Sequence, residues 1–227
     1  MAPRIPSTGL MLPMKIWDLP IRLFHWILVA LIVGSYVTIE LNMLALHMLC
    51  GEAILVLVLW RLVWGFIGSE TARFSQFIRS PLAGIRHLLR FPRREPDTQI
   101  GHNEAGGWMV VGMLALLLAQ IGTGLFGRND EDFVEGPLSK LIAKPLSETL
   151  LSLHFLTFDL VTIVVVLHVV AIIAYAVVKR HDLVRPMLTG KKRLPAATPA
   201  PRIVSPMLAG AVLIVIAVLV WLAVTRL

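Results

Sequence analysis

The chain has 227 residues, of which 57% are hydrophobic and only 15% are charged, and its mean hydropathy is +0.79. A soluble domain carries about 25% charged residues, so this composition excludes an ordinary water-soluble protein and predicts an integral membrane protein. We interpret the formal net charge of +7 as a signal of membrane topology and of attraction to anionic lipid, and not as a nucleic-acid binding surface.

Five apolar runs are each long enough to cross a hydrocarbon core, which takes about 20 mostly apolar residues. In chain order they cover residues 22–41, 44–67, 106–127, 150–178 and 204–226. The first run lacks a small-residue cleavage site, so we expect a retained span and not a signal peptide. The expected fold is an all-α integral membrane protein, with a four-helix transmembrane bundle and a fifth, C-terminal transmembrane helix. The expected divisions are an N-terminal segment 1–21, the bundle 22–192, a Pro-rich linker 193–203 and the extra helix 204–227.

The basic residues indicate the orientation of these spans. Most of the 21 Lys and Arg residues fall before the first span, between the second and third, or between the fourth and fifth, which is one side of the membrane. The opposite side holds few basic residues, Arg128, Lys140, Lys144 and Arg226, and a loop with five acidic ones, Asp130, Glu131, Asp132, Glu135 and Glu148. By the positive-inside rule we expect a cytoplasmic N-terminus and a C-terminus outside.

Histidines inside the spans are the candidate ligands, because a single cysteine, Cys50, excludes a disulfide, a thiolate iron–sulfur site and a c-type haem attachment. His154 and His168 lie fourteen residues apart, so both imidazoles leave one helix face about 21 Å apart along the axis. With alternating span directions, His47 lies at the depth of His154 near the outer boundary, and His25 at the depth of His168 on the inner side. Neutral imidazole can ligate a metal within hydrocarbon.

Two imidazoles that approach one flat macrocycle from opposite sides make a six-coordinate haem b. The spacing therefore predicts two haem b per chain. The inner iron would be held by His25 and His168, and the outer iron by His47 and His154. Six-coordination leaves no open position at the iron, which favours electron transfer. Arg61 lies fourteen residues after His47, so it faces the inner haem, and a haem propionate is its expected partner.

Plainer alternatives remain for several of these residues. Intramembrane histidines also serve as hydrogen-bonding groups between helices, and Arg61 could extend to the inner interface. Gly51 and the glycines of the third span could admit a porphyrin or only allow close helix packing. Glu52 and Asp159 each follow an outer ligand by five residues. We expect them to be protonated packing groups, with proton transfer as the alternative.

Three further histidines lie outside the spans. His102 precedes the third span, and we expect it to bond backbone at the start of that span and not to be a ligand. His87 and His181 are expected to be solvated loop residues.

Short motifs occur in order along the spans: WDLPIRLFHW, LHMLCGE followed by RLVWGFIGS, ARFSQFIRSPLA, GHNEAGGWMV, GLF, and the paired LHF and LHV. Over about residues 14–192 the chain resembles the bacterial cytochrome b561 family, close to the b-type cytochrome subunits of nickel-iron hydrogenases and distantly similar to formate dehydrogenase gamma subunits. Carried over by position, the resemblance implies the same ligand pairs as the depth argument. The fifth span, Glu52, Asp159 and the acidic loop 129–135 depart from the family pattern.

The resemblance implies electron transfer between the membrane quinone pool and a periplasmic redox partner, either a c-type cytochrome or a redox enzyme subunit. Arg22, Arg61 and Lys179 on the basic inner side prompt the hypothesis of a quinone pocket near the inner haem. Two alternatives stay open: a superoxide oxidase that reduces quinone, which the net acidic outer loop disfavours, and the membrane anchor and electron conduit of a hydrogenase or dehydrogenase. The residues leave open the direction of electron flow, the oligomeric state, and whether the protein acts as a quinol or quinone oxidoreductase.

Overall fold

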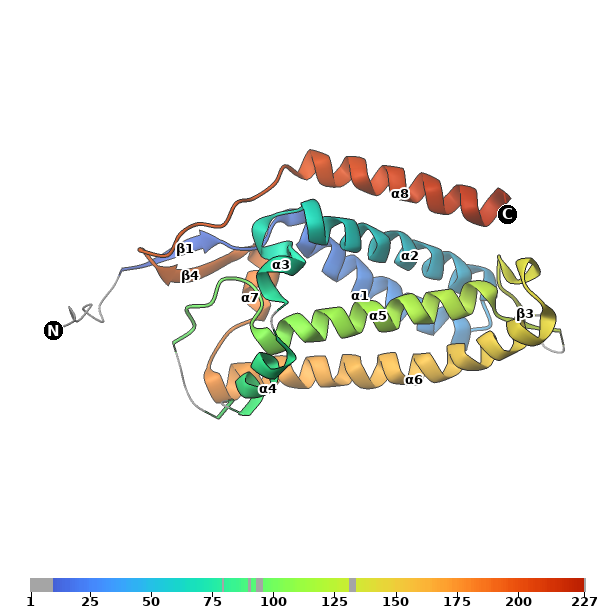
Figure 1. Ribbon diagram of the computed structural model, residues 1–227, viewed down its shortest axis with the longest axis horizontal. Coiled ribbons are helices and arrows are strands. Elements are labelled where there is room, and N and C mark those ends of the chain that lie inside the picture. Colours follow the sequence, from blue (N-terminus) through green and yellow to red (C-terminus); the bar gives the residue numbers. More distant parts are fainter. Residues whose placement is uncertain (1–9, 79, 90, 93–95, 131–133, 227) are drawn as a thin grey trace.

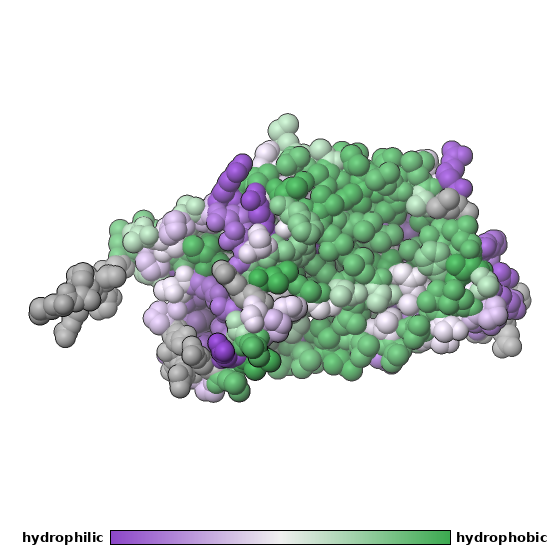
Figure 2. All heavy atoms as spheres, viewed as in Figure 1, coloured by the Kyte–Doolittle hydropathy of each residue, from purple (hydrophilic) through white to green (hydrophobic). Residues whose placement is uncertain are grey.

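The computed structural model describes residues 10–78, 80–89, 91–92, 96–130 and 134–226. Five long helices dominate it: α1 (Leu19–Glu40), α2 (Leu44–Ile67), α5 (Glu104–Phe126), α6 (Lys144–Ala174) and α8 (Pro206–Arg226). Each of them is long and apolar enough to cross a membrane. Figure 2 shows apolar side chains over the middle of the bundle and polar ones gathered at its two ends. The expected all-α, multi-pass membrane fold is confirmed.

The fourth span begins earlier than its apolar run. Helix α6 starts at Lys144, where an apolar start at residue 150 was expected, and it continues through a π-helical turn, η3 (Tyr175–Lys179). Pro145 occupies the first turn of α6, where a missing N–H donor costs nothing. The polar residues that follow it are compatible with a helix although they are not apolar. Hydropathy therefore marked the lipid-facing part of this helix and missed its first turns.

Asp18 fixes the start of α1 and ties it to α2. Its Oδ1 accepts the backbone N–H of Ile21 at 2.7 Å as the N-cap, and its Oδ2 accepts the indole N–H of Trp64 at 3.1 Å. The side chain is buried, with 1% of its surface exposed. One carboxylate thus satisfies two donors at the place where two of the spans meet.

Replacing Asp18 by alanine should destabilise this end of the bundle. The change leaves the α1 cap and the buried indole donor of Trp64 without their acceptor, and we expect a loss of about 1 to 3 kcal/mol. The measurement is the thermal unfolding midpoint of the detergent-solubilised protein. Asp18→Asn, which keeps the Oδ1 acceptor, should lose clearly less, and equal midpoints for all three proteins would contradict this role.

Helices α1, α2, α5 and α6 form the bundle, and α8 lies along its outside (Figure 1). Helix α1 packs along α2, α2 along α5, and α5 along α6. Buried apolar side chains of α2, α5 and α6 form one core, made of Ile54, Val58, Leu114, Leu117, Ile121 and Val161. Helix α8 packs on α2, where Trp60 Nε1 donates to the carbonyl of Ala209 at 3.0 Å. The additional helix is therefore attached to the bundle from one side only.

Short elements close the two ends of the bundle. At one end, β1 (Met11–Lys15) pairs antiparallel with β4 (Lys191–Pro195), beside η1 (Glu70–Ala72), α3 (Phe74–Phe77), α4 (Pro81–Leu89) and α7 (Val184–Thr189). We call this the β1–β4 end. The opposite, β2–β3 end holds β2 (Arg128–Asn129), β3 (Val134–Glu135) and η2 (Ser139–Leu141).

The β1–β4 sheet was not expected from the sequence. Its strands come from the N-terminal segment and from the start of the Pro-rich linker, and each has only five residues, so neither carries a clear strand pattern alone. Some residues used to predict topology, namely Arg4, Arg79, Arg90, Arg93, Arg94, Glu131 and Asp132, lie outside the described residues.

Candidate functional site

The four intramembrane histidines meet in two pairs. His47 of α2 and His154 of α6 lie toward the β2–β3 end, with ring centroids 6.2 Å apart and planes at 90°. His25 of α1 and His168 of α6 lie toward the β1–β4 end, with centroids 6.5 Å apart and planes at 51°. Two metal–nitrogen bonds and the two ring radii together span about 6 Å. Each gap therefore has the width that one bis-imidazole metal ion requires.

The surroundings of the pairs leave room for a flat cofactor. Helix α6 packs closely along α5, whereas α1 and α2, which carry the partner histidines, stand off from it. Gly51 lies one turn after His47 on the same helix face, and a Cβ placed there would meet no atom within 4 Å. The residues present thus fit haem, which His25 with His168, and His47 with His154, would hold between the helices.

Gly124 of α5 lies close to His154 of the outer pair. A Cβ added at Gly124 would lie 2.8 Å from Cε1 and 3.0 Å from Nδ1 of His154. This glycine therefore admits the ring of His154, which is the close-packing alternative left open by the sequence. Gly107 likewise admits a neighbouring segment, since its Cβ would lie 2.6 Å from the carbonyl oxygen of Phe77. Both glycines allow a close approach that any side chain would block.

The rings of the outer pair are oriented by hydrogen bonds to backbone carbonyls. Nδ1 of His47 lies 2.9 Å from the carbonyl oxygen of Ser35, and Nδ1 of His154 lies 2.8 Å from that of Gln120. A carbonyl only accepts, so each Nδ1 carries the proton and each Nε2 carries the lone pair; in His154 that Nε2 lies 3.2 Å from the side-chain Nε2 of Gln120, which a metal would have to displace. In the inner pair, Nδ1 of His25 is buried and has no partner among the described residues.

Arg61 is buried near the inner pair and does not extend to the interface. Its side chain is 3% exposed, its Nη2 donates to the carbonyl of Ala72 at 3.0 Å, and its guanidinium lies 5.0 Å from the ring centre of Phe74. Nη1 is buried without a partner among the described residues. A free guanidinium N–H in this position suits the carboxylate of a haem propionate.

His102 is packed among aromatic side chains at the β1–β4 end. Its ring packs between Trp17 and Phe77, at centroid distances of 4.9 and 5.1 Å. Burial, and next the nearby charge of Arg61, lowers the pKa of His102 to about 3, so its imidazole is neutral at physiological pH. The expected bond from His102 to backbone at the start of α5 is not among the contacts of the described residues; Asn103 Oδ1 instead accepts the N–H of Gly106 at 2.7 Å as the α5 cap.

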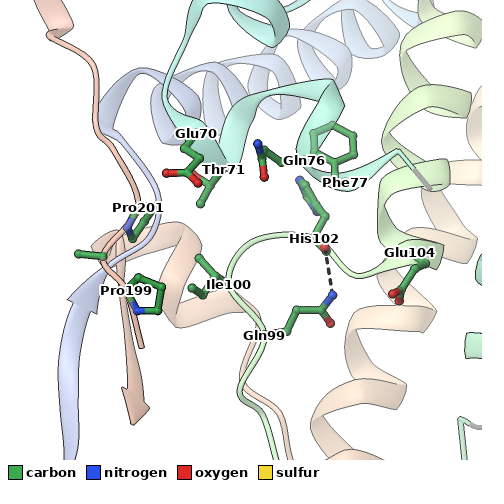
Figure 3. Close-up of a pocket in the computed structure, with 11 residues that line it drawn as sticks. Glu70, Thr71, Gln76, Phe77, Gln99, Ile100, His102, Glu104, Pro199 and Pro201 are labelled. Atoms are coloured by element: carbon green, nitrogen blue, oxygen red, sulfur yellow. Dashed lines mark hydrogen bonds between the residues drawn. The ribbon is translucent and has the colours of Figure 1, made fainter. Parts of the chain in front are cut away.

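A polar cleft of about 360 Å³ reaches His102 from the surface of the β1–β4 end (Figure 3). Carboxyl and amide side chains line it, and these come from η1, α3, the segment before α5 and the start of α5: Glu70, Gln76, Gln99 and Glu104. Residues 199–201 of the linker form its opposite wall. The cleft therefore brings water to the side of the bundle that holds the inner histidines.

His87 and His181 were expected to be solvated loop residues, and this expectation was wrong. Nε2 of His87 lies 2.7 Å from the hydroxyl of Tyr175, and its Nδ1 lies 3.3 Å from a carboxylate oxygen of Glu104. The side chain of His181 is 13% exposed and its Nδ1 lies 3.8 Å from Asp97. The π-helical turn at the end of α6 places Tyr175 among these groups, which sequence spacing alone does not show.

The two intramembrane carboxyls differ in their surroundings. Glu52 is half-buried on α2, whereas Asp159 is exposed on the surface of α6. The expectation of a packing group does not hold for Asp159, whose side chain is exposed, and it stays a prediction for Glu52.

Each basic side chain of the loop at the β2–β3 end is paired with an acid. Asp130 binds both Arg128 and Lys144 at 2.5 Å, and Lys140 lies 3.4 Å from Glu135. Hydrogen bonds from Lys144 and Arg128 lower the pKa of Asp130. The described part of this surface is thus charge-balanced, and Glu131 and Asp132, which make the loop net acidic in the sequence, lie outside the described residues.

A family model described as prokaryotic cytochrome b561 matches residues 16–190. The chain belongs to the prokaryotic cytochrome b561 family. It is also similar to a protein of Bradyrhizobium diazoefficiens named "Probable Ni/Fe-hydrogenase B-type cytochrome subunit", with 23% identity over 211 residues that cover 78% of this chain and 85% of that protein. No solved structure matches the chain. The family resemblance seen in the sequence is confirmed.

Family membership identifies this protein as a bacterial, multi-pass membrane b-type cytochrome that acts in electron transfer, and it implies b-type haem. The sequence analysis missed several polar residues that surround the outer pair of this cytochrome. Gln120 Nε2 lies 3.2 Å from Nε2 of His154, and Thr157 donates to Gln120 Oε1. The available signal was the presence of polar side chains inside apolar runs, which are functional suspects in a membrane.

Proposed function

We propose that this cytochrome b561 holds two haem b groups and carries electrons across the bacterial inner membrane. His25 and His168 would ligate the inner haem, and His47 and His154 the outer one. The observation that supports this is the pairing of imidazoles at 6.5 and 6.2 Å on helices that cross the membrane. His154 and His168 share one helix face about 21 Å apart along its axis, so the two haems form a two-step route for electrons.

The haem supplies one-electron iron chemistry, and the protein supplies its binding and surroundings. The carbonyls of Ser35 and Gln120 accept from Nδ1 of the outer imidazoles, so Nε2 would be the nitrogen that ligates the iron. Arg61 offers a buried N–H to an anionic propionate at the inner haem. Arg22 has a buried Nε without a partner among the described residues, and its Nη1 donates to the carbonyl of Leu188 at 2.5 Å. Both cations favour an anionic or carbonyl ligand at this end.

The proposed electron donor or acceptor in the membrane is quinone, bound near the inner haem. Quinone reduction consumes protons together with electrons, and the cleft that reaches His102 gives water access to that end. Lys179, 7% exposed, belongs to the same end. We place the β1–β4 end and the N-terminus in the cytoplasm and the C-terminus in the periplasm, following the excess of basic residues.

The proposed partner on the opposite side is a periplasmic redox protein, either a redox enzyme subunit or a c-type cytochrome. The hydrogenase-subunit name of the Bradyrhizobium relative favours an enzyme subunit, and with it a role as membrane anchor and electron conduit. The pairing of Arg128, Lys140 and Lys144 with acids offers little attraction to an anion. Superoxide is therefore a less suitable substrate than a protein partner.

Haem quantitation and a reduced-minus-oxidised spectrum of the purified protein test this proposal. We expect two haems per chain with low-spin b-type bands, and reduction of both haems by an added quinol under anaerobic conditions. One haem per chain, or a high-spin spectrum, would contradict the paired ligation. A normal spectrum without any response to quinol would reject only the quinone link.

Arg61 provides a sharper test of the inner end. Arg61→Gln removes the charge next to the inner haem, and we expect quinol-driven haem reduction to slow by about tenfold or more, because charge-assisted hydrogen bonds to the bound groups are lost. Arg61→Lys keeps the charge and should retain most of the rate. The measurement is stopped-flow haem reduction at equal haem content. An unchanged rate in Arg61→Gln would count against an inner quinone pocket that uses this residue.

A further inference from the structure

The two outer histidines are held by closely similar arrangements on different helices, and each Nδ1 also lies near a hydroxyl: Ser35 Oγ is 3.1 Å from His47 Nδ1 and Thr123 Oγ1 is 3.3 Å from His154 Nδ1. The carbonyl of Ser35 on α1 accepts from His47 Nδ1, and the carbonyl of Gln120 on α5 accepts from His154 Nδ1. In each case a threonine three residues further along donates its hydroxyl to that same carbonyl. Thr38 lies 3.0 Å from Ser35 O, and Thr123 lies 2.9 Å from Gln120 O.

Both threonines also donate to the carbonyl four residues earlier in their helix. Thr38 lies 2.8 Å from Gly34 O, and Thr123 lies 2.8 Å from Ala119 O. Back-bonding of this kind bends a helix and turns its carbonyls away from the axis. A carbonyl turned outward can accept an additional donor from a neighbouring helix. Each threonine therefore aims one carbonyl at one haem ligand.

The inner pair lacks this arrangement. Nδ1 of His25 is buried without a partner, and the ring of His168 has no hydrogen bond within the part of the chain that the structure describes. The nearby charged group is instead the buried guanidinium of Arg61, which lies close enough to influence the pKa of His102 beside the inner histidines. The two ends thus differ in the groups that act on the ligands and on the iron.

Both differences would make the reduction potential of the outer haem lower than that of the inner haem. An imidazole that donates its Nδ1 proton to a carbonyl is a more basic ligand and stabilises oxidised iron, which lowers the potential. A buried cation stabilises the reduced iron, which has one positive charge less, and so raises the potential. The hydrogen bonds to carbonyls would lower the potential of the outer haem, and the buried cation would raise the potential of the inner haem.

We propose that Thr38 and Thr123 are positioning residues that, through the carbonyls of Ser35 and Gln120, keep the outer haem at a lower reduction potential than the inner haem. The inference rests on the two-haem function proposed above. It makes the step from the outer to the inner haem the favourable one, whichever partner supplies the electron.

Redox titration of the full-length protein in detergent, followed by optical spectra, tests the proposal. The test variants are Thr38→Val and Thr123→Val, alone and combined, since valine keeps the shape and lacks the donor. At a fixed ambient potential we expect the ratio of reduced to oxidised outer haem to rise about fivefold in the double variant. The reduction potential of the inner haem should not shift. The inner haem is identified as the component whose potential responds to Arg61→Gln.

Two controls separate this effect from general disturbance of the helices. Thr38→Ser and Thr123→Ser retain the hydroxyl and should keep the parent potential. Thr225→Val removes the same kind of back-bond, to Trp221 O on α8, and should change neither haem. If the double valine variant kept two normal low-spin haems but its outer potential were unshifted or lowered, the inference alone would be overturned. The same would follow if the outer haem of the parent protein titrated at a higher potential than the inner haem. Loss of two-haem stoichiometry in the parent protein would instead overturn the proposed function.

Discussion

Replacing His154 by alanine is expected to lower the haem content of the protein to about half and to remove the outer haem only. The structure places His154 against His47 at one end of the bundle and His168 against His25 at the other, so each pair holds its own group. His168→Ala should give the mirror result, with loss of the inner haem. The measurement is the haem-to-protein ratio together with a redox titration that resolves the remaining component.

His87→Gln is the matched control, because His87 is a histidine of the same chain that contacts Tyr175 and neither pair. It should keep the parent haem content. If His154→Ala and His168→Ala left the same component, or if either variant kept both haems, the ligand pairing argued from the structure would be wrong. Complete loss of haem in both variants, with the helices intact by circular dichroism, would show that the two sites do not fill independently.

Gly124→Val is the second change with a large expected effect. The added Cβ would lie 2.8 Å from Cε1 of His154, and the ring cannot retreat without breaking its Nδ1 bond to Gln120 O. We expect the outer haem to be lost or weakly bound although all four histidines are present. The measurement is again haem content per chain, with the helical signal as a check that the bundle has formed.

Gly210→Ala on α8 is its control, since a Cβ there would meet no atom within 4 Å. This variant should bind haem like the parent protein. Normal occupancy of the outer site in Gly124→Val would mean that the ring of His154 does not depend on this close approach. An equal loss of both haems would indicate a general folding defect and not a local steric one.

The four histidines show what the helical repeat can and cannot predict about a site. A fourteen-residue spacing specifies that His154 and His168 share a face, because the α-helix repeats every 3.6 residues. It does not specify which helices face them. The structure supplies that information: α1 and α2 carry the partners, and α5 packs against α6 on another side.

The same limit explains the residues that were missed or misassigned. Ser35, Thr38, Gln120 and Thr123 are ordinary polar residues within apolar runs, and only the packing of α1 on α2 and of α5 on α6 brings their carbonyls to the ligands. Likewise, His87 and Tyr175 meet only because the short helix α4 folds back against the bundle. Such contacts depend on segments that are far apart in the chain.

By itself the sequence determined that this chain has five segments long and apolar enough to cross a membrane, and that four histidines lie within them at two levels. These properties follow from hydropathy and helical repeat, which are local and one-dimensional. Only the tertiary structure decided that the histidine rings meet in pairs 6.2 and 6.5 Å apart, that Arg61 is buried with a donor unpaired among the described residues, and that β1 pairs with β4. Distances between distant segments depend on how helices pack against one another, and packing is a property of the whole chain.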